Sequence, residues 1–181
     1  MKRALIALGL GLALAGNANA ERLERYSAHL QGFNAAGAAV ATNATGEAQV
    51  DIIDDGTAIA FRVNVAGIRN LWMAHIHVSP APVTVTGPAG PPAFWFVGGP
   101  PPQATLSETV NGRLAEGFII TSSDVVSWNP GDPLTGTVPG LVAAIREGRA
   151  SVIVHTNDPS GNTAPGTQGN SPPGELRGTL R

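Results

Sequence analysis

The sequence predicts an all-β fold, an antiparallel sandwich or barrel with one short helix near residues 139–147. Short runs of alternating apolar and polar side chains recur along the chain, and this period of two is typical of half-buried strands. The 23 glycines and 15 prolines cluster between those runs, which favours ordered strands joined by long loops over disorder. A single segment has a helical pattern. The prediction is therefore about eight strands and one helix, without an internal repeat.

The strands are separated by clear turn signals. Asp55-Gly56, between two alternating runs, predicts a hairpin. Residues 80–103 hold eight of the fifteen prolines, so they should form a loop with edge strands, because proline cannot donate to a ladder. Residues 157–173 form a second loop rich in glycine, proline and asparagine, and Gly117 predicts a bulge. The predicted strands are residues 25–32, 47–53, 58–65, 71–79, 113–122, 150–156 and 174–180. The proline-rich loop adds two short apolar runs as edge strands, residues 83–86 and 93–97.

The helix is predicted over residues 139–147, because Pro139 can open a helix and Gly148 can close one. Its apolar side consists of Leu141, Val142 and Ile145. No other stretch combines helix start and stop signals with an apolar stripe.

Residues 1–20 are predicted to be an export signal rather than part of the fold. Lys2-Arg3 forms a basic start, an apolar run follows, and Ala18-Asn19-Ala20 matches a cleavage site. The apolar run is shorter than the roughly 20 residues that cross a bilayer, and no later segment qualifies. We expect a periplasmic or secreted protein cleaved near Ala20, with residues 21–181 as a single domain.

Composition excludes several classes of function. The chain has no cysteine, and hence no disulfide, thiolate ligand or thiol nucleophile. Its only lysine is Lys2, so after cleavage neither a Schiff-base nor a P-loop lysine is available. The formal net charge of −2 and the lack of a basic cluster argue against nucleic-acid binding. A glycosylation sequon begins at Asn43 and matters only in a eukaryotic secretory pathway.

Two of the four histidines lie in the apolar run 71–79, as His75-Ile76-His77. In a strand, successive side chains point to opposite faces. One face then carries Leu71, Met73, His75 and His77, and the other carries Trp72, Ala74, Ile76 and Val78. The two imidazoles lie about 6.5–7 Å apart along the strand, close enough to converge on one ion or ligand. His155, in the apolar run 150–156, could bring a third ring from a neighbouring strand.

Several short motifs, in this order, resemble the CHRD domain, a module named from chordin and present in many exported bacterial proteins. They are His-Ile-His at 75–77, the Gly/Pro loop after it, the strand ending in Val-His-Thr at 154–156, and Gly-Glu-Leu-Arg-Gly at 174–178. The similarity covers nearly the whole mature chain, from Tyr26 to Leu180. It implies an immunoglobulin-like or Greek-key sandwich and no established chemistry. The loop after the histidines departs from the family pattern, because it is richer in proline and poorer in glycine.

A weaker resemblance is to copper/zinc superoxide dismutases, which also pair a His-x-His strand with a later histidine and an arginine near the last strand. The matching positions are His75, His77, His155 and Arg177. The loop after His77 lacks the metal-bridging histidine of those enzymes, and their stabilising disulfide cannot form without cysteine. Dismutase activity is therefore not expected.

The leading functional hypothesis is a transition-metal site made by His75, His77 and His155. Imidazole suits copper, zinc and nickel, with bonds near 2.0–2.1 Å. Glu175 is a candidate additional ligand, and the thioether of Met73 would favour Cu(I). The expected cofactor is copper or zinc, or none.

The alternative hypothesis gives the histidines a structural role. Imidazoles on a sheet often bond to a carboxylate or a backbone carbonyl, and Glu175 or Asp158 could supply the carboxylate. Glu175 and Arg177 would form a structural ion pair, and His29 would lie on the surface. The protein would then be an interaction or matrix module that binds an unknown protein or small ligand through its Pro/Gly-rich loops. An enzyme ranks third, without a predicted catalytic residue, because no nucleophile elbow, HExxH, EF-hand or P-loop motif is present.

Overall fold

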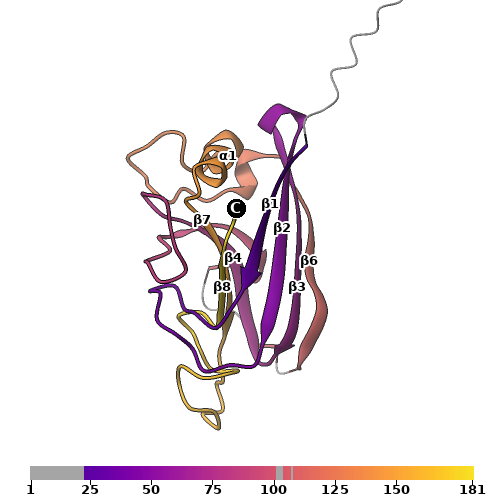
Figure 1. Cartoon of the computed structure of the whole chain (residues 1–181), viewed down its shortest axis with the longest axis vertical. Helices are drawn as coiled ribbons and strands as arrows, with labels where there is room; N and C mark the ends of the chain where they lie inside the picture. The colour runs from indigo at the N-terminus through magenta and orange to yellow at the C-terminus, as the bar shows by residue number, and fades with distance from the viewer. Residues whose placement is uncertain (1–22, 101–103, 107) are drawn as a thin grey trace, which may run out of the picture.

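The computed structural model describes residues 23–100, 104–106 and 108–181 as two antiparallel four-stranded sheets packed face to face (Figure 1). The first sheet has the spatial order β1 (Glu24–Leu30), β2 (Thr45–Ile53), β3 (Ala58–Ile68) and β6 (Val110–Ile119). The second has the order β5 (Pro92–Val97), β4 (Leu71–Val78), β7 (Ala150–Thr156) and β8 (Leu176–Thr179). The predicted all-β sandwich is confirmed. The predicted export signal, residues 1–20, lies outside the described residues.

The hydrophobic core lies between the two sheets, because alternate residues of most strands are apolar and face inward. Burial of one large aliphatic side chain contributes about 1.5–3 kcal/mol, so this layer stabilises the fold without a disulfide. The central members are Leu30, Val50, Ile52, Ile59 and Val63 from the first sheet and Ala74, Ile76, Val78, Val152, Val154 and Leu176 from the second.

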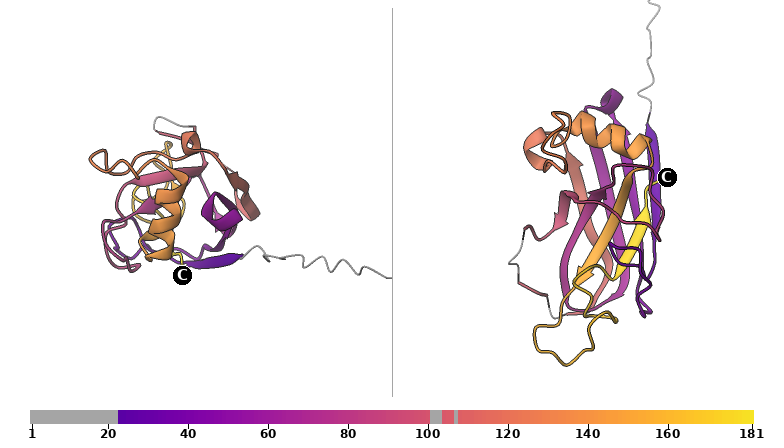
Figure 2. Two further views of the ribbon diagram at one scale, coloured as in Figure 1. Left: turned by 90° about the horizontal axis from the view of Figure 1, so that it is seen from above. Right: turned by 90° about the vertical axis from the view of Figure 1, so that its left-hand side faces the viewer.

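The helix α1 (Val138–Arg146) lies across one end of the sandwich (Figure 2). It begins one residue earlier than predicted, because Thr137 caps it: the Thr137 side chain accepts a hydrogen bond from the Gly140 backbone N–H at 3.1 Å. The predicted apolar side is buried against the core. Two 3-10 turns, η1 (Asp54–Gly56) and η2 (Ser122–Asp124), complete the regular structure. The first joins β2 to β3 as the predicted Asp-Gly hairpin, with Asp55 and Gly56 both at positive φ.

One side of the sandwich is closed by backbone hydrogen bonds between the edge strands β1 and β8. Gln31 and Arg177 exchange N–H···O bonds of 3.0 and 2.8 Å, and Ser27 and Arg181 exchange bonds of 2.9 and 3.0 Å. On the other side, the rings of Phe94 and Phe96 in β5 pack on Phe61 in β3, with centroids 5.3 and 4.9 Å apart. The protein is thus a sandwich with one closed edge.

Two details of the predicted strands are wrong. Residues 83–86 do not form an edge strand: residues 83–84 are irregular and 85–86 lie in a turn, and the carbonyl groups of Thr84 and Val85 accept hydrogen bonds from the guanidinium of Arg177. The bulge predicted at Gly117 lies instead at Leu114, where the register between β3 and β6 shifts by one residue. Gly117 stays in register and leaves room for the Phe61 ring, which a Cβ at this position would approach to 3.1 Å.

No helix among the residues that the structure describes is long and apolar enough to cross a membrane. The helix α1, at nine residues, is the longest of them.

Replacing Gly178 with alanine should open the seam between β1 and β8. A Cβ at Gly178 would lie 2.5 Å from the carbonyl oxygen of His29, and the backbone cannot move without breaking the closing hydrogen bonds. We expect Gly178→Ala to lower the free energy of unfolding by about 1–3 kcal/mol, measured by chemical denaturation. Gly131→Ala is the matched control, because its nearest contact would be an ordinary 3.7 Å. Equal stability of the two variants would contradict the role assigned to this seam.

Candidate metal centre

The three candidate histidines lie on the outward face of the second sheet. His75 and His77 are on β4, and His155 is on the adjacent strand β7. Their neighbours Ala74, Ile76 and Val154 point the other way, into the core. The strand alternation predicted for residues 73–78 is therefore confirmed.

The alternation fails at the start of β4, where Leu71 was predicted to share the histidine face. Leu71 instead belongs to the core and is 2% exposed. The register between β4 and β7 shifts between Leu71 and Met73, and a bulge of this kind turns the residues on either side of it to different faces. The bulge places Met73 directly opposite His155, on the outward face with His75.

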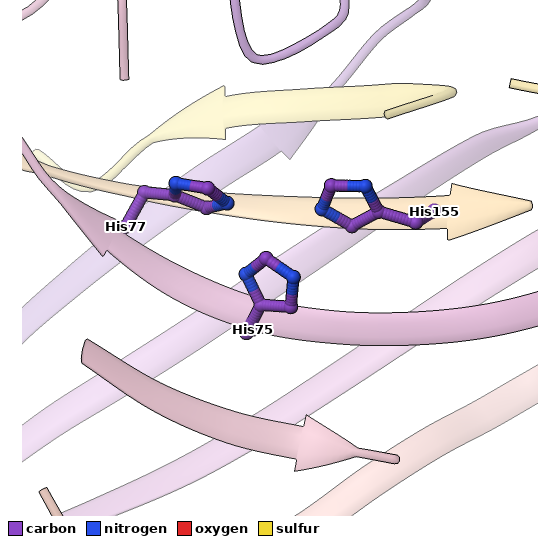
Figure 3. Close-up of side chains that lie close together, drawn as sticks. All are labelled: His75, His77 and His155. Atoms are coloured by element: carbon purple, nitrogen blue, oxygen red, sulfur yellow. The ribbon is translucent and has the colours of Figure 1, made fainter. Parts of the chain in front are cut away.

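The three imidazoles converge on one point (Figure 3). Each ring offers a nitrogen, and these three nitrogens lie within 4.8 Å of one another. The ring centroid of His75 lies 4.5 Å from that of His77 and 4.4 Å from that of His155. The predicted gathering of three rings from two strands is present.

Backbone carbonyl groups orient two of the rings. The Nδ1 of His77 lies 2.6 Å from the carbonyl oxygen of Gly90, and the Nδ1 of His155 lies 2.8 Å from that of Pro172. A carbonyl oxygen can only accept, so in both rings Nδ1 carries the proton and Nε2 keeps its lone pair. Gly90 and Pro172 belong to the two predicted Pro/Gly-rich loops, which therefore fold over the histidines.

Three ring nitrogens at the centre of this cluster have no hydrogen-bond partner. They are Nδ1 of His75 and Nε2 of His77 and His155, and each is buried away from solvent. The whole residues are 3%, 6% and 4% exposed, in the same order. The site thus holds several unpartnered nitrogen lone pairs in a closed space.

Burial keeps all three imidazoles neutral. It lowers the pKa of His75 to about 2, with further lowering by the charges of His155 and His77. It also lowers the pKa of His77 and of His155 to about 4, although the bonds to Gly90 and Pro172 act in the opposite direction. Neutral imidazole is the form that binds a metal ion.

Glu175 lies outside the histidine cluster, although it was a candidate ligand. Its carboxylate is fully buried and accepts hydrogen bonds of 2.7 Å each from the hydroxyl groups of Thr42 and Thr156 and from the backbone N–H of Gly169. These bonds join the β1–β2 loop, the end of β7 and the loop before β8. Glu175 therefore fixes the second Pro/Gly-rich loop rather than an ion.

The expected ion pair between Glu175 and Arg177 is not formed among the described residues. The guanidinium of Arg177 is fully buried and donates only to backbone carbonyl groups. These belong to two loops and are those of Asn34, Ala35, Thr84, Val85 and Gly87. The two residues differ in position along the strand. Glu175 precedes β8, and its carboxylate accepts hydrogen bonds from two loops and the end of β7. Arg177 lies within β8, opposite Ile153.

The other residues considered for the site, His29 and Asp158, lie outside the histidine cluster. His29 is exposed on the first sheet, as expected. Asp158 accepts hydrogen bonds from Ser160 and Thr163 within its own loop, and among the described residues it forms no hydrogen bond with an imidazole. Trp95 on β5, which the sequence did not single out for this site, lies opposite His75 with ring centroids 5.6 Å apart. The alternation of Phe94, Trp95 and Phe96 was the available signal, because it places the indole on the face opposite the two phenylalanines.

The metal-free protein should lose stability in mild acid. The unfolded histidines take up protons near pH 6.5, whereas the folded ones resist protonation down to about pH 4 or below. The unfolded state therefore binds more protons below pH 6.5, and the free energy of unfolding should fall by about 1.4 kcal/mol per pH unit for each histidine. Denaturation curves between pH 7.5 and 4.5 would measure this slope.

The slope should be smaller by about a third in His75→Leu, because one of three titrating groups is removed. His29→Ala is the control, since that histidine is exposed, and it should keep the wild-type slope. A stability that does not change between pH 7 and 5 would contradict the burial of neutral imidazoles.

Glu175→Gln should destabilise the protein, because an amide group cannot accept all three hydrogen bonds that the carboxylate accepts. We expect a loss of about 1.5–3 kcal/mol in the free energy of unfolding. Glu47→Gln, at an exposed position of β2, provides the matched control and should change stability little. If the two variants unfold at the same denaturant concentration, Glu175 does not fix the loop.

A family model described as the CHRD domain matches residues 26–162. This range contains β2 to β7 in full, most of β1 and all three histidines of the cluster. No curated protein and no solved structure matches the chain. Because the family model covers most of the sequence, the chain belongs to the CHRD domain family.

Proposed function

We propose that this protein is an exported metal-binding protein that holds one transition-metal ion, copper or zinc, through His75, His77 and His155. The observation that carries the proposal is the set of three unpartnered nitrogens that face one another inside a closed site. A CHRD domain alone implies no chemistry, so the proposal rests on these side chains.

The unpartnered nitrogens favour a metal ion over a purely structural role. A buried polar nitrogen without a hydrogen bond costs about 1–3 kcal/mol, and the Nε2 lone pairs of His77 and His155 are held in the same closed space. Histidines that serve only the fold would be expected to bond to one another, to a carboxylate or to the backbone through all their buried nitrogens. A single ion bound to all three nitrogens would remove these costs together.

The carbonyl bonds of His77 and His155 support the same proposal. In metal sites, the nitrogen that does not bind the ion usually donates to a carbonyl or carboxylate group, which fixes the tautomer and the orientation of the ring. Gly90 and Pro172 accept such bonds here. The two loops would therefore position the ligands as well as cover them.

The closed site favours storage, transfer or sensing of the ion over catalysis. A bound ion would supply a Lewis acid or a redox centre only if a substrate could reach an open coordination position. The histidines are instead covered by the two loops and nearly inaccessible to solvent. Export fits a role in metal handling outside the cytoplasm, and it rests on the basic and apolar pattern of residues 1–20.

Metal loading of the purified protein tests the proposal directly. After incubation with copper or zinc and removal of loose ions by gel filtration, elemental analysis should give about one ion per chain. His75→Ala and His155→Ala should each lose nearly all of it, because two imidazoles cannot hold an ion against washing. His29→Ala is the matched control and should load like the wild type.

Circular dichroism of each variant separates loss of ligand from loss of fold. Metal at background level in a folded wild-type protein, after both ions have been offered, would reject metal binding. The interaction module with structural histidines would then be the better description.

A further inference from the structure

We infer that the ion held by the histidine cluster is monovalent copper, with the thioether of Met73 as an additional ligand. This inference rests on the proposed function and narrows it, since the three histidines alone do not distinguish Cu(I) from Zn(II). The charge of the site, its closure to water and the placement of Met73 all favour Cu(I).

The site contains no negative charge to balance a divalent ion. The metal-ligating group among the described residues consists of three histidines without a carboxylate, and the Glu175 carboxylate is directed to other partners. The cost of burying an ion grows with the square of its charge, so a divalent ion costs about four times as much as a monovalent ion of equal radius.

A buried positive charge next to the cluster strengthens this preference. Arg177 is fully buried, lies on the same outward face as the histidines, and bonds only to carbonyl groups among the described residues. It is opposite Ile153, which is itself opposite His75 in the ladder. A guanidinium at this place repels a second cation, and the repulsion is half as large for a monovalent ion as for a divalent one.

The closure of the site also disfavours zinc. Zinc sites in proteins are four-coordinate, and a site with three protein ligands completes the set with water or a substrate. The three free nitrogens here are buried away from solvent, which leaves no access for such a water. Cu(I) is stable with three ligands and carries no requirement for a bound hydroxide.

Met73 lies beside the histidine cluster, on the same outward face of the sheet, and offers a soft ligand in addition to the three imidazoles. It is two residues before His75 on β4 and directly opposite His155 on β7, and it is 6% exposed. It is buried but is not part of the apolar cluster packed between the two sheets. Thioether sulfur prefers Cu(I) to zinc.

Competition experiments distinguish the two ions. In the absence of oxygen, and with ascorbate to keep copper reduced, the protein should remove Cu(I) from bicinchoninate. Its Kd for Cu(I) should be lower than its Kd for Zn(II), measured against a chromophoric zinc chelator, by at least about 1000-fold.

X-ray absorption of the copper-loaded protein tests the sulfur ligand. The chain has no cysteine and only two methionines, one of which is Met1, so a sulfur neighbour of the ion can be assigned to Met73. Met73→Leu should remove that neighbour and weaken Cu(I) binding about 10–100-fold, while Zn(II) binding stays unchanged. Ile153→Leu, an equally conservative change on the same face, is the matched control and should keep both affinities.

The outcomes separate this inference from the proposed function. Tight Cu(I) binding with sulfur next to the ion supports both. Zn(II) binding as tight as Cu(I) binding, or a copper neighbourhood of nitrogen and oxygen alone, overturns the inference and leaves metal binding intact. Failure to bind either ion in the folded protein overturns both.

Discussion

The structure depends on polar side chains of the second sheet that bind the backbone of two loops. Arg177, His77 and His155 stand on the outward face of this sheet, and each bonds to a carbonyl group of a loop that folds over it. Carbonyl groups turned inward in this way are lost to any strand ladder, which is why the loops stay irregular. The sandwich therefore has a third layer, made of loops, on one side.

This third layer decides the chemistry of the histidines. An imidazole on the open face of a sheet would be hydrated and would titrate near its ordinary pKa. Under the loops, the three rings lose solvent and remain neutral, and one nitrogen of each ring has no hydrogen-bond partner. The proposed preference for an ion of low charge rests on the absence of carboxylates as much as on the presence of imidazoles.

Glu175 and Arg177 show how two neighbouring charges can be buried without pairing. Each charge is stabilised by hydrogen bonds with uncharged groups. Hydroxyl and N–H donors surround the carboxylate, and carbonyl acceptors surround the guanidinium. Both residues connect segments that are far apart in the sequence. Their side chains hold the loops in place around the histidine cluster, since each of these side-chain hydrogen bonds ends on a loop or at the end of a strand.

Periodicity and turn residues were enough to predict the sandwich, the hairpin at Asp55-Gly56, the helix and the convergence of His75 and His77 on one face, because these signals act over a few neighbouring positions. Three features became visible in the folded chain alone: the bulge that moves Leu71 into the core, the separate partners of Glu175 and Arg177, and the place of Trp95. Each of these depends on strand register or on contacts between distant segments, and no local pattern encodes either.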